Sequence, residues 1–220
     1  MDNEIVESAK EVTKAACKAL DISEKLGGFL THVFGTLPED VVGIIIGDWL
    51  HQVRIRNLGW YAQRTEEILK KRGIKTETKS ISPSIALPLF RAAQDETRDE
   101  LRELWARMIV NAMDSSRSSV VRQTIIATVK IFEPLDAIIM QKAYNLPLLD
   151  YGKQNKYRRN VLHLPKELAV SQDEFEVSIQ NLYELNCIQA AGKMEKEGVP
   201  ITPYINFTSF GREVLRACSL

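Results

Sequence analysis

One long amphipathic helix constrains the fold of this chain more than any other feature of its sequence. Residues 41–72 carry apolar side chains at three- and four-residue spacing, which is typical of a helix with one buried face. Pro38 and the two acids after it indicate where the helix starts, because proline and acidic side chains are favoured in a first helical turn. The basic run 70–72 followed by Gly73 indicates where it ends. The sequence therefore predicts a long central helix on which other helices pack.

Further helices are predicted on both sides of this long helix. Residues 4–20 form an amphipathic pattern, and residues 82–114 form another whose second half has a regular apolar stripe. Residues 120–132 are expected to continue as a helix up to Glu133 and Pro134. Together these elements predict a helical bundle over residues 1–133.

The pattern changes after Pro134. A helix, a short helix, a longer helix, two short strand-like runs and a last helix are expected in turn, over residues 135–149, 165–170, 171–186, 187–191, 204–208 and 209–218. Ser171 and Glu174 have the spacing of a capping box, which favours a helix start at this point. This order is typical of a winged helix-turn-helix. We therefore expect a mainly α protein whose residues 134–220 form a winged-helix-like domain with a small two-stranded wing.

The charge and cysteine content limit what the chain can bind and where it works. The 220 residues contain 29 basic and 29 acidic side chains, so the formal net charge is zero. Nucleic-acid affinity rests mainly on Lys and Arg neutralising phosphates, and the balance argues against a general polyanion binder. Three widely separated cysteines favour a reducing compartment, and the start of the chain lacks the pattern of a signal peptide. A cytoplasmic location is expected.

Motifs that support catalysis or cofactor binding are not found in the sequence. Neither G-x-G-x-x-G nor a Walker A pattern is present, and there is no G-x-S-x-G. The three histidines, His32, His51 and His163, are far apart and far from the cysteines, so no metal-ligand spacing exists. We therefore expect no catalytic residue, no cofactor and no metal, and predict that the chain is not an enzyme.

The helix expected at 171–186 argues against DNA binding by the winged-helix-like domain. It occupies the position of a recognition helix, yet it carries four acids and neither Lys nor Arg. Each acid close to a phosphate costs on the order of 1 kcal/mol even at the dielectric constant of water. Contact with a protein partner is the better interpretation of this helix.

Two groups of basic residues leave an alternative open. Lys153, Lys156, Arg158 and Arg159 lie beside Tyr157, a composition that suits single-stranded nucleic acid through charge and stacking. A solvated loop is the simpler interpretation of residues 153–159. Arg54 and Arg56 form the second group, but residues two apart on a helix point to different sides of it. The aromatic residues near them are expected to be part of the core.

A third function is suggested by residues 26–50, which form a glycine-rich pair of apolar segments around an acidic turn. Such a hairpin is compatible with insertion into a membrane surface. Three acids, Glu39, Asp40 and Asp48, make this costly in lipid, so burial against the other helices is favoured. We expect no membrane partner.

Two longer segments carry a family resemblance. The segments at 47–74 and 80–114 read GDWLHQVRIRNLGWYAQRTEEILKKRGI and SISPSIALPLFRAAQDETRDELRELWARMIVNAMD. With the final FTSFGREVLRAC at 207–218, they resemble the abortive-infection alpha family of bacterial proteins. The resemblance covers most of the chain after about residue 35, and it implies a role in phage defence. It carries no known catalytic residues to this chain.

The expectation that follows is a non-enzymatic protein that acts through macromolecular contacts. A host or phage protein is the expected partner, with self-association as a further possibility. Nucleic-acid binding through residues 153–159 and membrane activity through residues 26–50 remain the alternatives.

Overall fold

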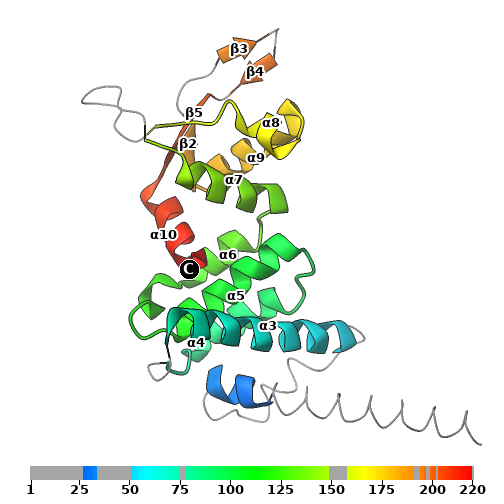
Figure 1. Cartoon of the computed structure of the whole chain (residues 1–220), viewed down its shortest axis with the longest axis vertical. Helices are drawn as coiled ribbons and strands as arrows, with labels where there is room; N and C mark the ends of the chain where they lie inside the picture. The colour runs from blue at the N-terminus through cyan, green and yellow to red at the C-terminus, as the bar shows by residue number, and fades with distance from the viewer. Residues whose placement is uncertain are drawn as a thin grey trace, which may run out of the picture.

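The computed structural model describes residues 27–33, 51–74, 78–148, 158–190, 194–196, 199–201 and 203–219. These residues form an elongated molecule, with helices stacked along its long axis and a small antiparallel sheet toward one end (Figure 1). Mainly α structure was expected, and it is confirmed.

The first half of the described chain is helical. Its elements are a short helix over residues 27–33, α3 (His51–Arg72), α4 (Pro83–Ala93), α5 (Asp99–Met113), the 3-10 helix η1 (Ser118–Val120) and α6 (Gln123–Val129). The predicted end of the long helix is confirmed: α3 stops at Arg72, and Gly73 has a φ of 68°, a left-handed conformation that glycine adopts without strain. The predicted start near residue 41 lies outside the described residues.

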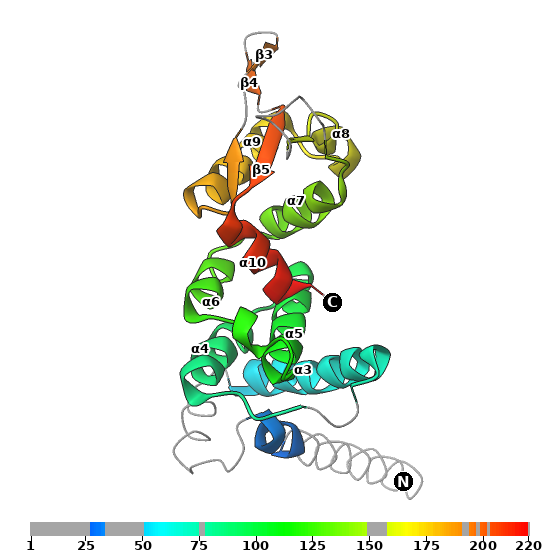
Figure 2. The same cartoon turned by 90° about the vertical axis from the view of Figure 1, so that its left-hand side faces the viewer.

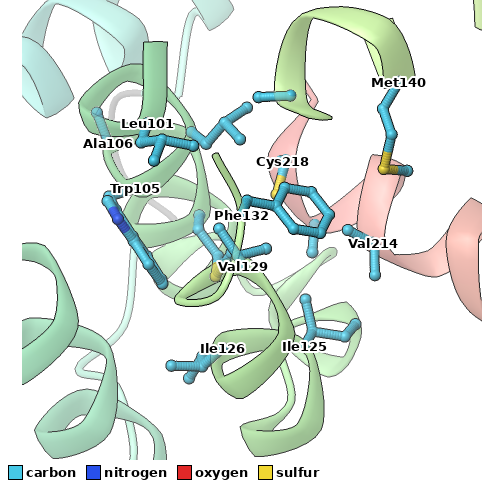
Figure 3. Close-up of a cluster of buried hydrophobic side chains, with 14 of the residues drawn as sticks. Leu101, Trp105, Ala106, Ile125, Ile126, Val129, Phe132, Met140, Val214 and Cys218 are labelled. Atoms are coloured by element: carbon cyan, nitrogen blue, oxygen red, sulfur yellow. The ribbon is translucent and has the colours of Figure 1, made fainter. Parts of the chain in front are cut away.

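Helix α5 lies at the centre of this half. It contacts α3 and α4 on one side and α7 and α10 on the other. Its predicted apolar stripe is buried, since Leu101, Trp105 and Ile109 are at most 1% exposed. Trp105 and Phe132 lie in the cluster of apolar side chains between these helices (Figure 3).

The prediction of one continuous helix over residues 120–132 is wrong. The chain forms η1, passes through extended backbone at Val121 and Arg122, and starts a new helix at Gln123. Val121 is only 3% exposed, so the extended conformation, which a β-branched residue adopts easily, places its side chain in the core.

The second half of the described chain combines helices with short strands. Its elements are α7 (Pro134–Asn145), β1 (Arg159–Asn160), α8 (Leu164–Leu168), α9 (Gln172–Glu184), β2 (Ile188–Ala190), β3 (Met194–Lys196), β4 (Val199–Ile201), β5 (Tyr204–Phe207) and α10 (Ser209–Cys218). The predicted capping box of α9 is confirmed, because the Ser171 backbone N–H donates to Glu174 Oε2 at 2.9 Å while Glu174 N–H donates to Ser171 Oγ at 3.2 Å.

The sheet contains the two predicted strands and a third one. β2 and β5 are antiparallel, and β1 pairs with the other edge of β5, so the strand order is β1-β5-β2. A solvated loop was the simpler interpretation of residues 153–159. That interpretation is corrected at Arg159, which pairs with Ile205 while the next residue, Asn160, pairs with Tyr204, so both belong to a strand. The turn expected between β2 and β5 holds a second pair of strands, β3 and β4, which extends from the rest of the molecule (Figure 2).

Helix α10 runs back from the sheet onto the first half of the chain. It contacts α5 and α6, and its red ribbon lies between the upper and lower helices (Figure 2). Asn111 of α5 donates through Nδ2 to the carbonyls of Ala217 and Ser219 at 2.9 and 3.0 Å, which satisfies the end of α10. The domain boundary expected between residues 133 and 134 remains a prediction. Helix α10 follows that boundary in the chain but packs on α5 and α6, which precede it.

Candidate functional site

Helix α9 is fixed in the fold by one apolar face. Phe175, Ile179 and Leu182 are at most 2% exposed. Next to them, Asn181 Nδ2 donates to Asp136 Oδ2 of α7 at 2.5 Å, so the helix is anchored by a hydrogen bond as well as by packing. These contacts set which side chains of α9 face outward.

The outward face of α9 combines carboxylates with apolar side chains. The acids of the helix are Asp173, Glu174, Glu176 and Glu184. Val177 is 70% exposed and Tyr183 is 51% exposed, so the face also presents two large apolar groups to solvent. We call the group Asp173, Glu176, Val177, Gln180, Tyr183 and Glu184 the α9 face.

The side chains of this face are partly held in place by contacts within the helix. Gln172 Nε2 donates to Glu176 Oε1 at 3.0 Å, and Gln180 Nε2 donates to Glu184 Oε1 at 2.9 Å. Glu174 contributes to the cap: the backbone hydrogen bond from Ser171 lowers its pKa, so it stays ionised in that role. The α9 face therefore presents ordered negative charge around Val177.

The predicted basic group is only partly described. Lys153, Lys156 and Tyr157 lie outside the described residues. Arg158 forms an isolated bridge and Arg159 begins β1; both are half-buried.

The Arg159 side chain is used within the fold. Its guanidinium lies 5.1 Å from the ring centre of Phe207 and 5.5 Å from that of Tyr144, and these two rings pack edge to face. Burial lowers the pKa of Arg159, and the nearby positive charge of Arg212 adds to this effect. Arg159 therefore joins β1, α7 and β5 through cation–π contacts, and was not expected in this structural role.

As their spacing predicts, Arg54 and Arg56 point to different sides of α3 and do not form one patch. Arg54 is half-buried and its Nε donates to Asp95 Oδ1 at 2.7 Å, whereas Arg56 is exposed. Of the aromatic residues nearby, Tyr61 is fully buried, and its ring meets that of Trp60 edge to face at 5.1 Å. The expectation that they belong to the core is confirmed for Tyr61.

The described part of residues 26–50 is the helix over residues 27–33. Its Leu30 and Val33 are 7% and 0% exposed, and Phe29 packs 5.8 Å from the ring of Phe90. These side chains are thus buried against other helices, while residues 34–50 lie outside the described residues. Within the described chain, no helix is both long and apolar enough to cross a bilayer.

Metal-ligating side chains and reactive thiols are the groups that could support chemistry in this chain. In the part of the chain that the structure describes, no three potential metal-ligating side chains gather. Cys187 and Cys218 are buried, and burial raises the pKa of each thiol to about 12. Both therefore remain protonated thiols at neutral pH and are weak nucleophiles.

Comparison with known families identifies the chain. The family described as abortive infection alpha matches residues 54–218, which is most of the chain and includes α9. The chain belongs to the abortive infection alpha family. No curated protein and no solved structure matches it.

Membership in the abortive infection alpha family confirms the resemblance seen in the sequence and indicates a role in abortive infection. The matched region runs from α3 to α10, so the family signature includes both the helical half and the half that holds the sheet. The acidic character of α9 was visible in the sequence. The outward orientation of Val177 and Tyr183 was signalled only by their absence from the apolar stripe of the helix.

Proposed function

We propose that this member of the abortive infection alpha family acts without catalysis, by binding a protein partner through the α9 face. The partner contributes a basic segment that also carries an apolar side chain. The supporting observation is the composition of that face, in which exposed Val177 is surrounded by carboxylates on a helix that has neither Lys nor Arg.

The connectivity of residues 134–218 supports a winged-helix-like form of the interaction domain. The order α7, β1, α8, α9, β2, β5 with the sheet order β1-β5-β2 is that expected of a winged helix. The β3–β4 pair then takes the place of the wing, and α9 that of the recognition helix.

The charges of α9 favour a protein over DNA in that position. A recognition helix lies among phosphates, where the acids of the α9 face raise the energy of the complex. If a basic protein segment binds instead of DNA, each electrostatic interaction with these acids becomes attractive. Exposed ion pairs contribute about 0.2–1 kcal/mol each, so we attribute orientation and association rate to the charges and much of the affinity to burial of Val177 and Tyr183.

Phage plating with a charge-reversal variant tests this proposal. The variant Asp173→Lys with Glu184→Lys changes two exposed acids of the α9 face. The control, Glu100→Lys with Glu66→Lys, makes the same change in charge on exposed positions of α5 and α3. Asp173 and Glu100 both lie in the first turn of a helix, so the helix-dipole effect of these two substitutions is matched.

The wild-type protein is expected to lower the plating efficiency of at least one phage in a sensitive host. The control variant should keep this protection and the α9 variant should lose it, with equal expression and unchanged circular dichroism. Protection by the α9 variant equal to wild type contradicts the role of the α9 face. Unchanged plating over many phages with wild-type protein contradicts the defence role itself.

A second candidate function is binding of single-stranded nucleic acid through residues 153–159. The observation that favours it is the positive charge of half-buried Arg159 beside Arg212 and over two aromatic rings. A gel shift at moderate salt with the Lys153→Gln, Lys156→Gln variant tests it, because Arg159 and its packing stay intact. Binding by the wild type that the variant loses supports this function, and failure of the wild type to shift DNA or RNA rules it out.

A further inference from the structure

A cavity lies where the two halves of the described chain meet. It has a volume of about 280 Å³ and lies between α5, α7 and α10. The side chains of Phe132, Met140, Val214 and Cys218 converge in this region (Figure 3). The cavity is lined by Leu104, Arg107, Phe132, Ala137, Met140, Gln141, Tyr144, Asn145, Val214, Leu215, Arg216, Cys218 and Ser219.

The apolar side chains that line the cavity favour a ligand whose main part is apolar. Leu104, Phe132, Met140 and Val214 supply hydrocarbon and thioether surface from three helices and the segment before α7. A buried apolar cavity of roughly 150 Å³ holds benzene, which has six carbon atoms. By that measure, the cavity of this protein, of about 280 Å³, accommodates roughly eleven non-hydrogen atoms.

The charged side chains that line the cavity favour a ligand whose polar group is negatively charged. Among the described residues that line the cavity, the charged ones are Arg107 and Arg216, both cations. Arg216 is largely exposed and pairs with Glu213 at 2.7 Å. Arg107 is 21% exposed, and its Nε donates to Glu103 at 3.1 Å, which directs the guanidinium while its two terminal nitrogens remain able to donate.

The end of helix α10 does not cancel this positive charge. The last carbonyls of a helix carry partial negative charge, and Cys218 and Ser219 line the cavity. The carbonyls of Ala217 and Ser219 already accept hydrogen bonds from Asn111, and that of Ser219 also accepts from Arg72 at 2.9 Å. Arg107 also acts electrostatically on the buried Cys218 thiol, which places its charge close to the cavity.

We propose that this cavity binds a small amphipathic carboxylate, such as a medium-chain fatty acid. The hydrocarbon chain lies against Phe132, Met140 and Val214, and the carboxylate accepts hydrogen bonds from Arg107. A planar guanidinium suits a carboxylate because it can donate two parallel hydrogen bonds. This site is separate from the α9 face and does not depend on the function proposed for that face.

Binding in this cavity has a consequence for the arrangement of the helices. A ligand there contacts α5 in the first half of the chain and α7 and α10 in the second half. A ligand that binds only the packed arrangement stabilises the packing of these halves through its binding free energy. The cavity therefore gives a small molecule a means of controlling how firmly α10 is held on α5.

Calorimetric titration of the full chain tests the proposal with three probes of equal chain length: decanoate, decan-1-ol and decyltrimethylammonium, each below its aggregation concentration. Decanoate is expected to bind at one site per chain. The alcohol should bind at least about tenfold more weakly, since it lacks the charge-assisted hydrogen bonds to Arg107, and the cation should not bind.

Two variants test the contribution of the Arg107 charge and the contribution of the cavity space separately. Arg107→Met keeps the aliphatic stem and should weaken decanoate binding by about tenfold or more while leaving decan-1-ol unchanged. Ala137→Leu fills the cavity from α7 and should remove binding of both. Arg91→Met, on an exposed position of α4 away from the cavity, is the matched control and should change neither.

The outcomes that overturn the proposal are equally specific. They are no saturable binding of decanoate by the wild type, equal affinities for all three probes, or decanoate binding that survives in Arg107→Met. Thermal unfolding of each variant shows whether it is folded. Because Arg107 is not fully buried, Arg107→Met keeps the test valid even if Ala137→Leu does not fold.

Discussion

Gly211 is the position in α10 where the backbone packs so closely that no side chain fits. A Cβ atom at this position would lie 1.8 Å from the carbonyl oxygen of Cys187, whereas real contacts of this kind are longer than 3.0 Å. The clash is with the backbone of the residue that precedes β2, so no rotamer change relieves it. Thr208 Oγ1 accepts from Gly211 N–H at 2.8 Å and fixes the same turn.

Gly211→Ala should therefore destabilise the protein by about 3 kcal/mol, at the upper end of the usual effect of overpacking. Urea unfolding followed by circular dichroism measures it. Gly28→Ala is the matched control: a Cβ there meets nothing within 4 Å, and alanine is favoured over glycine in a helix, so this substitution should not destabilise the protein. Equal effects of the two substitutions would show that α10 does not approach Cys187 so closely.

Asp136 is a buried acid that makes stability depend on pH. Burial raises its pKa above the ordinary value of about 3.9, although hydrogen bonds such as the one from Glu133 N–H at 2.8 Å oppose the shift. The folded state thus holds the proton more tightly than the unfolded state. The stability that this group contributes is present at low pH and is lost as the pH rises through the raised pKa.

Asp136→Asn keeps an oxygen for the Glu133 and Asn181 hydrogen bonds and removes the charge. We expect the free energy of unfolding of the variant, relative to wild type, to increase as the pH rises from 4 to 7. Urea unfolding of both proteins at several pH values measures this difference. A difference that does not change with pH, or that changes in the opposite direction, contradicts the assigned cause.

At the scale of single elements, helix α10 depends on α5 for its C-terminal cap. Asn111 is fully buried, accepts from Arg72 Nη1 at 2.8 Å and donates to the last carbonyls of α10. A carbonyl or guanidinium left without a partner inside a protein costs about 1–3 kcal/mol.

Asn111→Leu should therefore lower the free energy of unfolding by roughly 2–4 kcal/mol. It should also speed the reaction of Cys218 with a maleimide, because Cys218 is buried at the end of α10. Mass spectrometry of the labelled peptides separates Cys218 from the other cysteines. Gln63→Leu, on an exposed position of α3, is the control. Unchanged labelling of Cys218 in Asn111→Leu would mean that the cap does not hold α10 in place.

The elements that sequence predicted are those whose signals are local. The stop at Gly73, the Ser171–Glu174 capping box and the apolar stripe of α5 each lie within a few residues of the structure that they specify. The break before α6 was missed because Val120 and Val121 fit the helical spacing, whereas the burial of Val121 through extended backbone depends on elements distant in the chain.

The contacts that join distant segments could not be predicted in this way. Arg159 lies over Tyr144 and Phe207, and Asn111 bonds to Ala217, which is 106 residues away in the chain. Such pairs form only once whole helices and strands have packed together. The spacing of residues in a single sequence does not indicate which elements pack on one another. The acidic composition of α9 was evident from the sequence, but the contacts that hold its opposite face in the core, such as the Asn181–Asp136 hydrogen bond, required the fold.

At the scale of the whole molecule, α10 links the sheet to the helical half, and α9 packs on α7 and β2 in the half that holds the sheet (Figure 1). The match to the abortive infection alpha family spans both halves. A partner bound at α9, as proposed, would therefore act on the half of the molecule that α7 and α10 attach to α5.

The central claim is that the protein works through contact between the α9 face and a basic segment of another protein. Site-specific photocrosslinking in phage-infected cells tests it most directly, with a photoreactive phenylalanine analogue at Val177. Ile131, an apolar residue that is 56% exposed and lies beyond the end of α6, is the control position.

The account predicts a discrete protein adduct from position 177 that is absent from position 131. The adduct should map to a Lys- or Arg-rich peptide and should disappear when Asp173 and Glu184 are changed to lysine. If position 177 forms no adduct in cells that the protein protects, or if its adduct survives the two lysine substitutions, the α9 face is not the binding surface.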